Sequence, residues 1–283
     1  VERIRDEFTK IMNSPGAYQG VQLLEDTGLM QFIIPELREG IGVDQNLHHI
    51  YTVWEHNLRT LKYAAQKNYS FVVRMACLLH DVGKPRTKRG KGRHCTFYAH
   101  DAVGGTMAQA IMERMRFPSE TAQKVALLVR YHMFYYNVGE VTESSVRRLI
   151  ANVGRENIED LLRLREGDRI GSGTPKAVPY KLRHLKYMID KVSHDPISVK
   201  MLKVDGKDIM EELASPPGPK IGLILNSLLA HVLDDPSLNT KEELRRRIHE
   251  LDKKTPDELR RALERIQKAI EKEEQERMKK YYV

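Results

Sequence analysis

The stretch that decides the fold is Leu78-Leu79-His80-Asp81-Val82-Gly83-Lys84-Pro85. Apolar residues recur at three- and four-residue spacing from 71 to 79, which predicts a buried helix ending at this stretch. His80 and Asp81 then stand together at the helix end, where the following glycine and proline stop the helix. Two adjacent side chains that can both bind a metal ion indicate a metal-binding role for this helix terminus.

Helical periodicity continues through the rest of the chain. It is clearest over residues 53–65, 103–115, 121–131 and 158–165. We find no pattern typical of a β-hairpin, and clusters of turn residues separate the apolar segments. Two late helix starts carry a capping box, Thr240 with Glu243 and Thr255 with Glu258. We therefore expect an all-α fold.

Composition narrows the class of protein. The 283 residues include 47 Lys and Arg against 39 Asp and Glu, a net charge of +8, and this excess is spread along the chain. Mean hydropathy is −0.52, and no apolar run approaches the length of a membrane span. Two cysteines, Cys77 and Cys95, cannot staple a chain of this length. We expect a soluble cytoplasmic protein with an anionic partner and no membrane association.

Metal-ligating residue types recur on separate predicted helices. Besides the adjacent pair, the candidates are His56 within a helix, His100 opening another, His132 ending a third and Asp168 ending a fourth. A helical bundle can direct such side chains into one interior cavity. Imidazole and carboxylate together suit Mn, Fe, Ni, Co or Zn, with Mg also compatible.

These residues resemble the HD superfamily of metal-dependent phosphohydrolases over residues 45–172. His56, the pair His80-Asp81 and Asp168 match the family's pattern of His, His-Asp and a distant Asp. His100 and His132 correspond to the two further histidines of members with two metals. The resemblance implies an HD-type helical bundle that holds one or two divalent transition metal ions.

The resemblance also implies a mechanism. Asp81 would bridge two ions, and a hydroxide held between them would attack a phosphate ester without a protein nucleophile. Lys84, one turn beyond the ligands, would hold the substrate phosphate as a point charge. Asp81 and Lys84 are therefore the expected catalytic residues.

A basic loop follows the helix end. It places six cations within residues 84–93, and the candidate phosphate-binding residues are Lys84, Arg86, Lys88, Arg89 and Arg93. Such a loop suits a polyanion, and Phe97 and Tyr98 would then stack on a base. The alternative is a solvated loop whose aromatic residues lie in the core.

Two residues outside the loop are further substrate-binding candidates. His49 lies two helical turns before His56. Arg148 is chosen over Arg147 because adjacent helix residues point in different directions and only one of the pair can face the site.

Flanking segments resemble a narrower family. Glu2–Phe8, Pro35–Leu37, Val204–Met210 and Pro217–Gly222 look like the neck, body and tail of HD-containing, CCA-adding tRNA nucleotidyltransferases and related poly(A) polymerases. The expected divisions are a helical neck over 1–44, an HD domain over 45–200, a helical tail over 201–252 and a charged C-terminal helix over 253–283. This likeness implies tRNA, or another RNA 3′ end, as a partner.

The nucleotidyltransferase head of that family has no counterpart. Nucleotide addition needs two carboxylates spaced as Asp-x-Asp to hold Mg²⁺, and the chain contains no such pair. We expect this chain alone to add no nucleotides. Both an excised half of a longer enzyme and a stand-alone descendant fit the sequence.

Three functions stay open at this point. The first is hydrolysis of a nucleotide or RNA-end phosphate ester, such as a 2′,3′-cyclic phosphate. The second is a tRNA-binding body whose metal site is structural or vestigial, and the third is a regulatory hydrolase of nucleotides or dinucleotides. An RNA-end enzyme should need the basic loop, whereas a small-nucleotide enzyme should tolerate its neutralisation. The sequence leaves the oligomeric state open.

Overall fold

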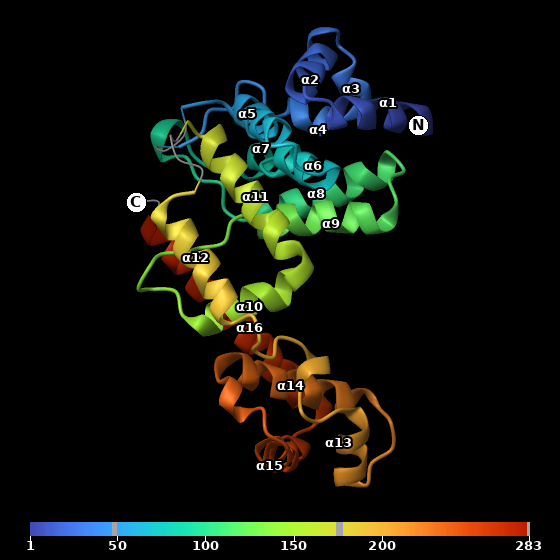
Figure 1. The fold of residues 1–283 in the computed structure, drawn as a ribbon, viewed down its shortest axis with the longest axis vertical. Helices are drawn as coiled ribbons and strands as arrows, with labels where there is room; N and C mark the ends of the chain where they lie inside the picture. The colour runs from blue at the N-terminus through green and yellow to red at the C-terminus, as the bar shows by residue number, and fades with distance from the viewer. Residues whose placement is uncertain (47–49, 174–177, 282–283) are drawn as a thin grey trace. The chain divides into compact units, whose positions relative to one another are not determined.

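The computed structural model describes residues 1–46, 50–173 and 178–281, without the side chains of residues 93, 274, 275 and 277–281. The described residues form α-helices and short 3₁₀ turns, and their one isolated β-bridge pairs Arg89 with Thr96 (Figure 1). The all-α expectation is confirmed.

The chain divides into two compact units that interleave along the sequence. The first comprises residues 1–134 and 153–179, and the second comprises residues 135–152 and 180–283. The helices of the first unit are α1 (Glu2–Asn13), α2 (Ala17–Asp26), α3 (Met30–Ile33), α4 (Pro35–Arg38), α5 (Val53–Gln66), α6 (Phe71–Leu79), α7 (Lys84–Thr87), α8 (His100–Arg114), α9 (Ser119–Tyr131) and α11 (Arg155–Gly171). Those of the second are α10 (Glu143–Val153, all but its last residue), α12 (Tyr180–Lys191), α13 (Gly206–Leu213), α14 (Pro219–Asp234), α15 (Lys241–Asp252) and α16 (Pro256–Tyr281).

Helix α6 is the centre of the first unit. Every residue from Val73 to Leu79 is buried, because α5, α9 and α11 all pack against this short helix. Helix α11 approaches α5 closely: a Cβ on Gly171 would lie 2.2 Å from Thr60 Oγ1 and 3.1 Å from the His56 carbonyl oxygen. Only glycine fits this contact, which brings the end of α11 beside the middle of α5.

The side chain of Arg74 links α6 to the end of α1 by hydrogen bonds. This side chain is buried, and Nη1 donates to the carbonyls of Met12 and Ser14, both at 2.8 Å. Nε donates to the Tyr69 carbonyl at 2.8 Å, and Nη2 to Asn68 Oδ1 at 2.9 Å. The guanidinium is thus satisfied by neutral oxygens, an arrangement that fixes the N-terminal helices on the core of the first unit.

The two capping boxes expected in the second unit differ in outcome. At α16, Thr255 N donates to Glu258 Oε2 at 2.7 Å and Glu258 N donates to Thr255 Oγ1 at 3.3 Å, which completes the box. At α15, Thr240 Oγ1 accepts from Glu243 N at 3.3 Å. The Glu243 carboxylate instead pairs with Arg246 and its neighbour at position 247, so only half of that box forms.

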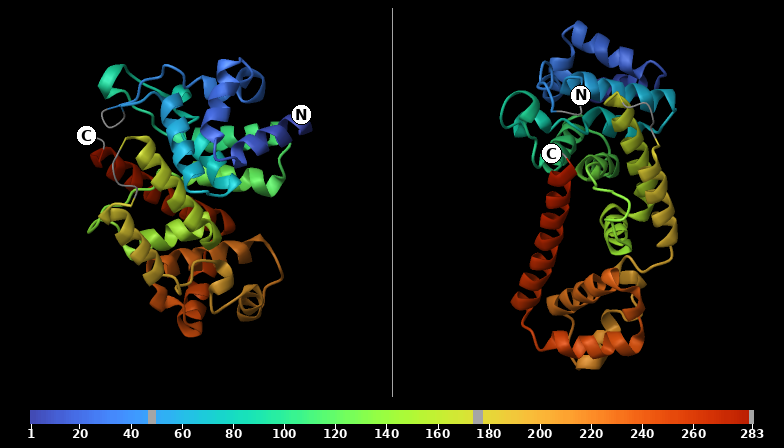
Figure 2. Two further views of the ribbon diagram at one scale, coloured as in Figure 1. Left: turned by 45° about the horizontal axis from the view of Figure 1, so that its top comes forward. Right: turned by 90° about the vertical axis from the view of Figure 1, so that its left-hand side faces the viewer.

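The second unit has its own apolar core. Ile209, Ile224, Leu228, Leu244 and Leu259, from α13, α14, α15 and the start of α16, are fully buried in one cluster. Beyond this cluster the rest of α16 extends away from α13–α15 (Figure 2). Among the described residues, no helix combines the length and apolar character needed to cross a membrane.

Candidate metal centre

Six predicted ligands meet in the first unit. His56 comes from the middle of α5, His80 caps α6 and is followed by Asp81, His100 opens α8, His132 caps α9, and Asp168 lies in the last turn of α11. All six are buried. Thr52 and Glu55 begin α5 with a reciprocal capping box, which sets where this helix starts and so the turn on which its histidine lies.

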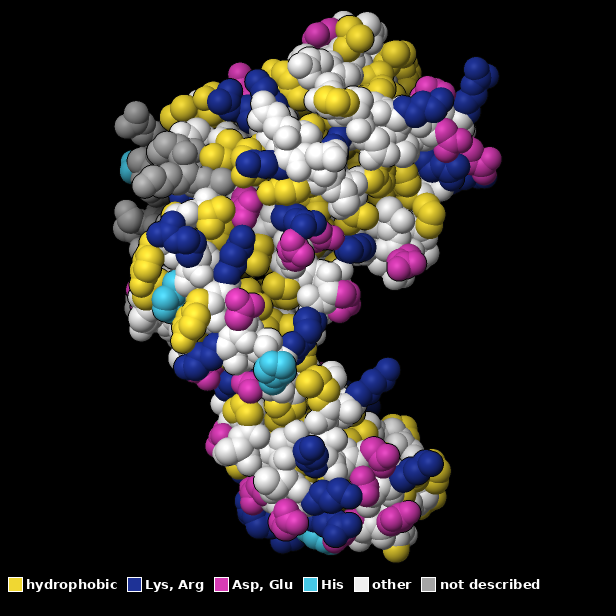
Figure 3. Space-filling view, in the orientation of Figure 1, with side chains coloured by type: hydrophobic (Ala, Val, Ile, Leu, Met, Phe, Trp, Pro, Cys, Tyr) yellow, Lys and Arg dark blue, Asp and Glu magenta, His cyan; other side chains and the backbone are white. Residues whose placement is uncertain are grey.

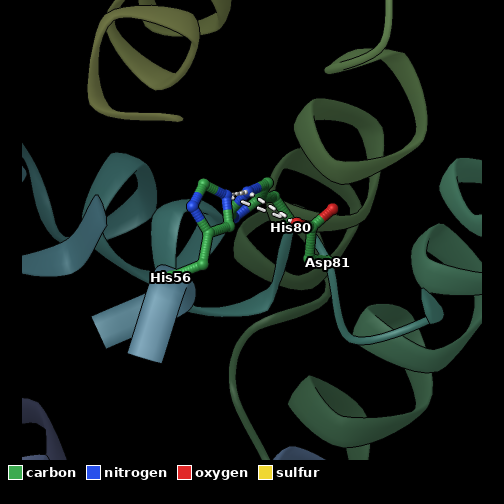
Figure 4. Close-up of side chains that lie close together, drawn as sticks. All are labelled: His56, His80 and Asp81. Carbon is green, nitrogen blue, oxygen red and sulfur yellow. Dashed lines mark hydrogen bonds and ion pairs between the residues drawn. The ribbon is translucent and has the colours of Figure 1, made fainter. Parts of the chain in front are cut away.

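One group of ligand atoms lies around Oδ2 of Asp81. His56 Nε2 and His80 Nε2 are each 3.4 Å from this oxygen and 2.9 Å from one another. Asp168 Oδ1 lies 3.2 Å from His56 Nε2 and 3.8 Å from His80 Nε2. Figure 4 shows the two imidazoles turned toward each other, with one oxygen of Asp81 beside them and the other pointing away. These atoms form a compact donor set of the kind that holds a transition metal.

A second group lies around the other oxygen of the same carboxylate. Asp81 Oδ1 is 3.4 Å from His100 Nε2 and 3.6 Å from His132 Nε2. Both imidazole nitrogens are buried and have no hydrogen-bond partner among the described residues. Buried nitrogens without partners, turned toward a carboxylate, fit a second metal ion. Asp81 is therefore common to two three-residue groups suited to metal binding.

The same local device orients three of the histidines. In each, Nδ1 lies within hydrogen-bond distance of the backbone carbonyl three residues earlier: His80 with Cys77 at 2.9 Å, His100 with Phe97 at 2.7 Å and His132 with Val129 at 2.7 Å. A carbonyl can only accept, so Nδ1 carries the proton and the Nε2 lone pair is left for a metal. Chain geometry near helix termini thus prepares these ligands before any ion binds.

Burial and neighbouring charges set the ionisation of the ligands. Burial lowers the pKa of His80 to about 3 and that of His100 to about 4. Burial alone would raise the pKa of Asp81, but His80 and Lys84 hold it well below its usual value. Burial likewise opposes ionisation of Asp168, whose pKa is held well below its usual value mainly by Arg165, 2.6 Å away. At neutral pH His80 and His100 are therefore neutral and the carboxylates of Asp81 and Asp168 are ionised, the forms that bind metals.

Lys84 lies at the site, as expected, with a partner that the sequence did not indicate. Its buried ammonium is 2.6 Å from Asp81 Oδ2 and donates to Gln45 Oε1 at 2.7 Å. Gln45 also donates from Nε2 to the Tyr51 carbonyl at 3.1 Å. Gln45 was missed because a lone glutamine in a loop carries no spacing signal. Lys84 is thereby held against the shared carboxylate.

Other residues of the basic loop have partners outside the ligand group. Arg86 pairs with Glu39 at 2.6 and 2.8 Å, Lys88 Nζ donates to the Asp44 carbonyl at 2.7 Å, and Arg89 exchanges two 2.9 Å backbone hydrogen bonds with Thr96. The side chain of Arg93 and all of His49 lie outside the described residues. Phe97 is buried, which places it in the core as the alternative interpretation expects, whereas Tyr98 is exposed.

The prediction chose Arg148 as the inward member of its arginine pair, but the buried member is Arg147. Its guanidinium donates to the carbonyls of Leu233 and Asp234, and to Asp195 Oδ2 at 2.9 Å. Arg148 belongs to the second unit and forms an ion pair with the Asp234 carboxylate. The carbonyls at the end of α14 have no partner within the helix and are satisfied by the buried guanidinium of Arg147, which explains why this arginine turns inward.

The helical fold and the six converging His and Asp side chains define a protein of the HD type. Residues 53–169 match the HD domain family, and residues 1–41 match a family described as a probable RNA and SrmB-binding site of polymerase A. Residues 53–169 are therefore an HD domain, and the chain is homologous to tRNA nucleotidyltransferases.

Three relatives illustrate this homology. The A-adding tRNA nucleotidyltransferase of Deinococcus radiodurans is 32% identical over 267 residues, which cover 90% of this chain and 59% of the relative. The CC-adding enzyme of Thermus thermophilus is 31% identical over 251 residues, 86% of this chain and 55% of the relative. A multifunctional CCA protein of Neisseria meningitidis is 28% identical over 152 residues, 53% of this chain and 36% of the relative. The chain thus spans less than two thirds of these relatives.

Proposed function

We propose that the chain is a metal-dependent phosphohydrolase acting on a phosphate ester of a nucleotide or RNA end, such as a 2′,3′-cyclic phosphate. One observation carries the proposal: the two oxygens of Asp81 face two different pairs of histidines, at 3.4 Å on one side and at 3.4 and 3.6 Å on the other. A single buried carboxylate shared in this way suits two adjacent divalent ions, one of the recurring architectures of phosphoester hydrolysis.

The protein's own residues would prepare the site. His56, His80 and Asp168 would hold one ion with Asp81, and His100 and His132 would hold the other. Divalent ions bound there would supply Lewis acidity and lower the pKa of coordinated water. The carbonyls behind three of the histidines would fix the tautomer and the orientation of the imidazoles.

Lys84 would bind the substrate. Its ammonium lies 2.6 Å from the shared carboxylate, so a phosphoryl group bound at the metal centre would lie within its reach. A fixed positive charge in a buried site stabilises the negative charge that develops as a phosphoryl group is transferred. Gln45, 2.7 Å from the same nitrogen, would keep Lys84 in place without neutralising it.

The test is metal content and turnover measured on the same sample. Protein purified without chelator is analysed for its elements, and hydrolysis of a 2′,3′-cyclic nucleotide is followed with and without Mn²⁺ or Ni²⁺. We expect about two transition-metal ions per chain and metal-dependent turnover, as the two ligand groups imply. Asp81→Ala should lose both metals and activity together, because the carboxylate serves both groups.

His249→Ala is the matched control. This histidine lies in the second unit and contacts Glu212 at 2.9 Å, so its loss should change neither metal content nor turnover. An Asp81→Ala protein that retained two metal equivalents would refute the site. Wild-type protein without metal and without metal-stimulated hydrolysis would refute the function.

A second function, tRNA binding, is favoured by a separate observation. Residues 1–41 match an RNA-binding family, and the relatives named above are tRNA nucleotidyltransferases by name. A cytoplasmic tRNA-binding body with a structural metal would bind tRNA with marked salt dependence and hydrolyse no phosphate ester. Binding of unmodified tRNA without hydrolysis would favour this function over the first.

A further inference from the structure

Helix α12 carries an aromatic face in the second unit. Tyr180, His184 and Tyr187 are spaced four and three residues apart, so they lie along one side of the helix. The two tyrosines are 62% and 60% exposed, whereas Leu182 and Leu185 on the other side are buried. Packing within the unit therefore accounts for the leucines but leaves the tyrosine rings on the surface.

The rings of this face contact one another. The His184 ring centroid lies 6.1 Å from that of Tyr180 and 6.0 Å from that of Tyr187. Tyr136 lies 5.9 Å away and shares a hydrogen bond between its hydroxyl and His184 Nδ1. The hydrogen bond to Tyr136 thus holds His184 between the exposed rings of Tyr180 and Tyr187. Together Tyr180, His184 and Tyr187 form an aromatic row that we call the α12 face.

The charged residues of helix α12 are mainly basic, and one of them, Lys191, pairs with Glu143 at 2.5 Å. Helix α12 contains four basic residues, Lys181, Arg183, Lys186 and Lys191, and one acidic residue, Asp190. Figure 3 shows basic, hydrophobic and histidine side chains interspersed over this helix. Exposed aromatic rings alone would suit many partners. Aromatic rings on a basic helix favour a polyanion that also carries flat rings able to stack, as the bases of a nucleic acid do.

We propose that the α12 face binds single-stranded RNA, with bases stacked on Tyr180 and Tyr187 and phosphates near the basic residues of α12. The inference deepens the proposed function, on which its choice of a nucleic-acid partner partly rests. Stacking tolerates any base, because every base presents a π face. The α12 face would therefore bind RNA without reading its sequence. A duplex, whose bases are already stacked, would bind more weakly.

The test compares three variants with the wild type by fluorescence anisotropy, using a 3′-fluorescein single-stranded RNA of mixed sequence. Tyr180→Ala/Tyr187→Ala should weaken binding about tenfold or more, since stacking contributes about 1–3 kcal/mol per base. Tyr180→Phe/Tyr187→Phe keeps both rings and should bind within about threefold of wild type. Met201→Ala, which removes another exposed apolar side chain of the second unit, should bind as wild type does. Thermal unfolding by circular dichroism checks that each variant is folded.

Two results would overturn the proposal: equal binding by the alanine variant and the wild type, or equal losses in the alanine and phenylalanine variants. A surface that instead docks a protein would give the first result. Hydrolysis of a 2′,3′-cyclic mononucleotide is measured separately. Absent hydrolysis with ring-dependent RNA binding would refute only the proposed function, and normal hydrolysis with ring-independent binding would refute only the α12 face.

Discussion

Replacing Gly83 with alanine should disrupt one half of the metal centre and leave the other in place. Gly83 follows the ligand pair His80-Asp81 by two residues and lies against the start of α8, which carries His100. A Cβ at this position would lie 2.3 Å from the His100 carbonyl oxygen and 2.7 Å from the Gly104 nitrogen. Both are backbone atoms, so no side-chain rotation relieves the overlap.

The magnitude follows from these distances. Real Cβ contacts essentially never fall below 3.0 Å, so the turn and α8 must separate by at least 3.0 − 2.3 = 0.7 Å. Metal–ligand distances tolerate about 0.2 Å, and His100 moves with α8 while Asp81 stays with the turn. Overpacking of this kind lowers the free energy of unfolding by about 1–3 kcal/mol. Alanine also restricts the unfolded chain more than glycine does, which raises the free energy of unfolding by up to about 1 kcal/mol.

The assay is metal content together with urea unfolding of metal-free protein. We expect Gly83→Ala to fall from about two metal ions per chain to about one, with a net loss of about 1–2 kcal/mol in the free energy of unfolding. The matched control is Gly222→Ala in α14, where a Cβ would meet nothing within 4 Å. It should gain about 0.5–1 kcal/mol and keep both metals. A Gly83→Ala protein with two metals and wild-type stability would refute the reasoning.

Three further substitutions test other parts of the structure. Lys84→Ala should keep the metals, because an ammonium is not a metal ligand. It should lower kcat/KM for a cyclic nucleotide on the order of 10²–10³-fold. Loss of metal together with activity would show that the role of Lys84 is structural. Arg74→Met leaves four oxygens without the guanidinium that donates to them. It should lower the free energy of unfolding in urea by at least about 3 kcal/mol. A loss under about 1 kcal/mol would mean that water replaces the guanidinium. Burial, and next the charge of Arg247, lower the pKa of His231, so the folded state binds this proton less readily than the unfolded state. Stability should therefore fall as pH drops below about 6.5, and His231→Gln should make this fall shallower; an unchanged pH profile of the unfolding free energy would contradict that.

The sequence could point to the six candidate ligands, which the structure brings together, because their signals are local. A helix end carrying His80-Asp81 and histidines at the starts and ends of other helices are visible in one chain, and the bundle then has few ways to bring them together. The roles of Gly83 and Gly171 were not predictable, because each depends on a backbone atom far away in sequence. The role of Gln45 was not predictable either, because its partner Lys84 lies 39 residues further along the chain.

Surface residues were harder to assign than buried ones. The choice of Arg148 over its neighbour depended on which side of α10 faces the interior. Arg147 turns inward to the carbonyls at the end of α14, which lie 86 and 87 residues further along the chain. The expected division into neck, HD domain and tail follows the order of the sequence. The compact units do not, because residues 135–152 leave the first unit and residues 153–179 return to it.

This interleaving has a consequence for synthesis on the ribosome. Five ligands lie before residue 135, but Asp168 follows an excursion into the second unit. The nascent chain must therefore wait for α11 to emerge before α5 and α6 gain the helix that covers them. Until then the buried faces of these helices are exposed, and they are open to premature association. The last candidate ligand to be made, Asp168, thus lies on the helix that closes the core of the first unit, so a complete set of candidate ligands would report a finished first unit.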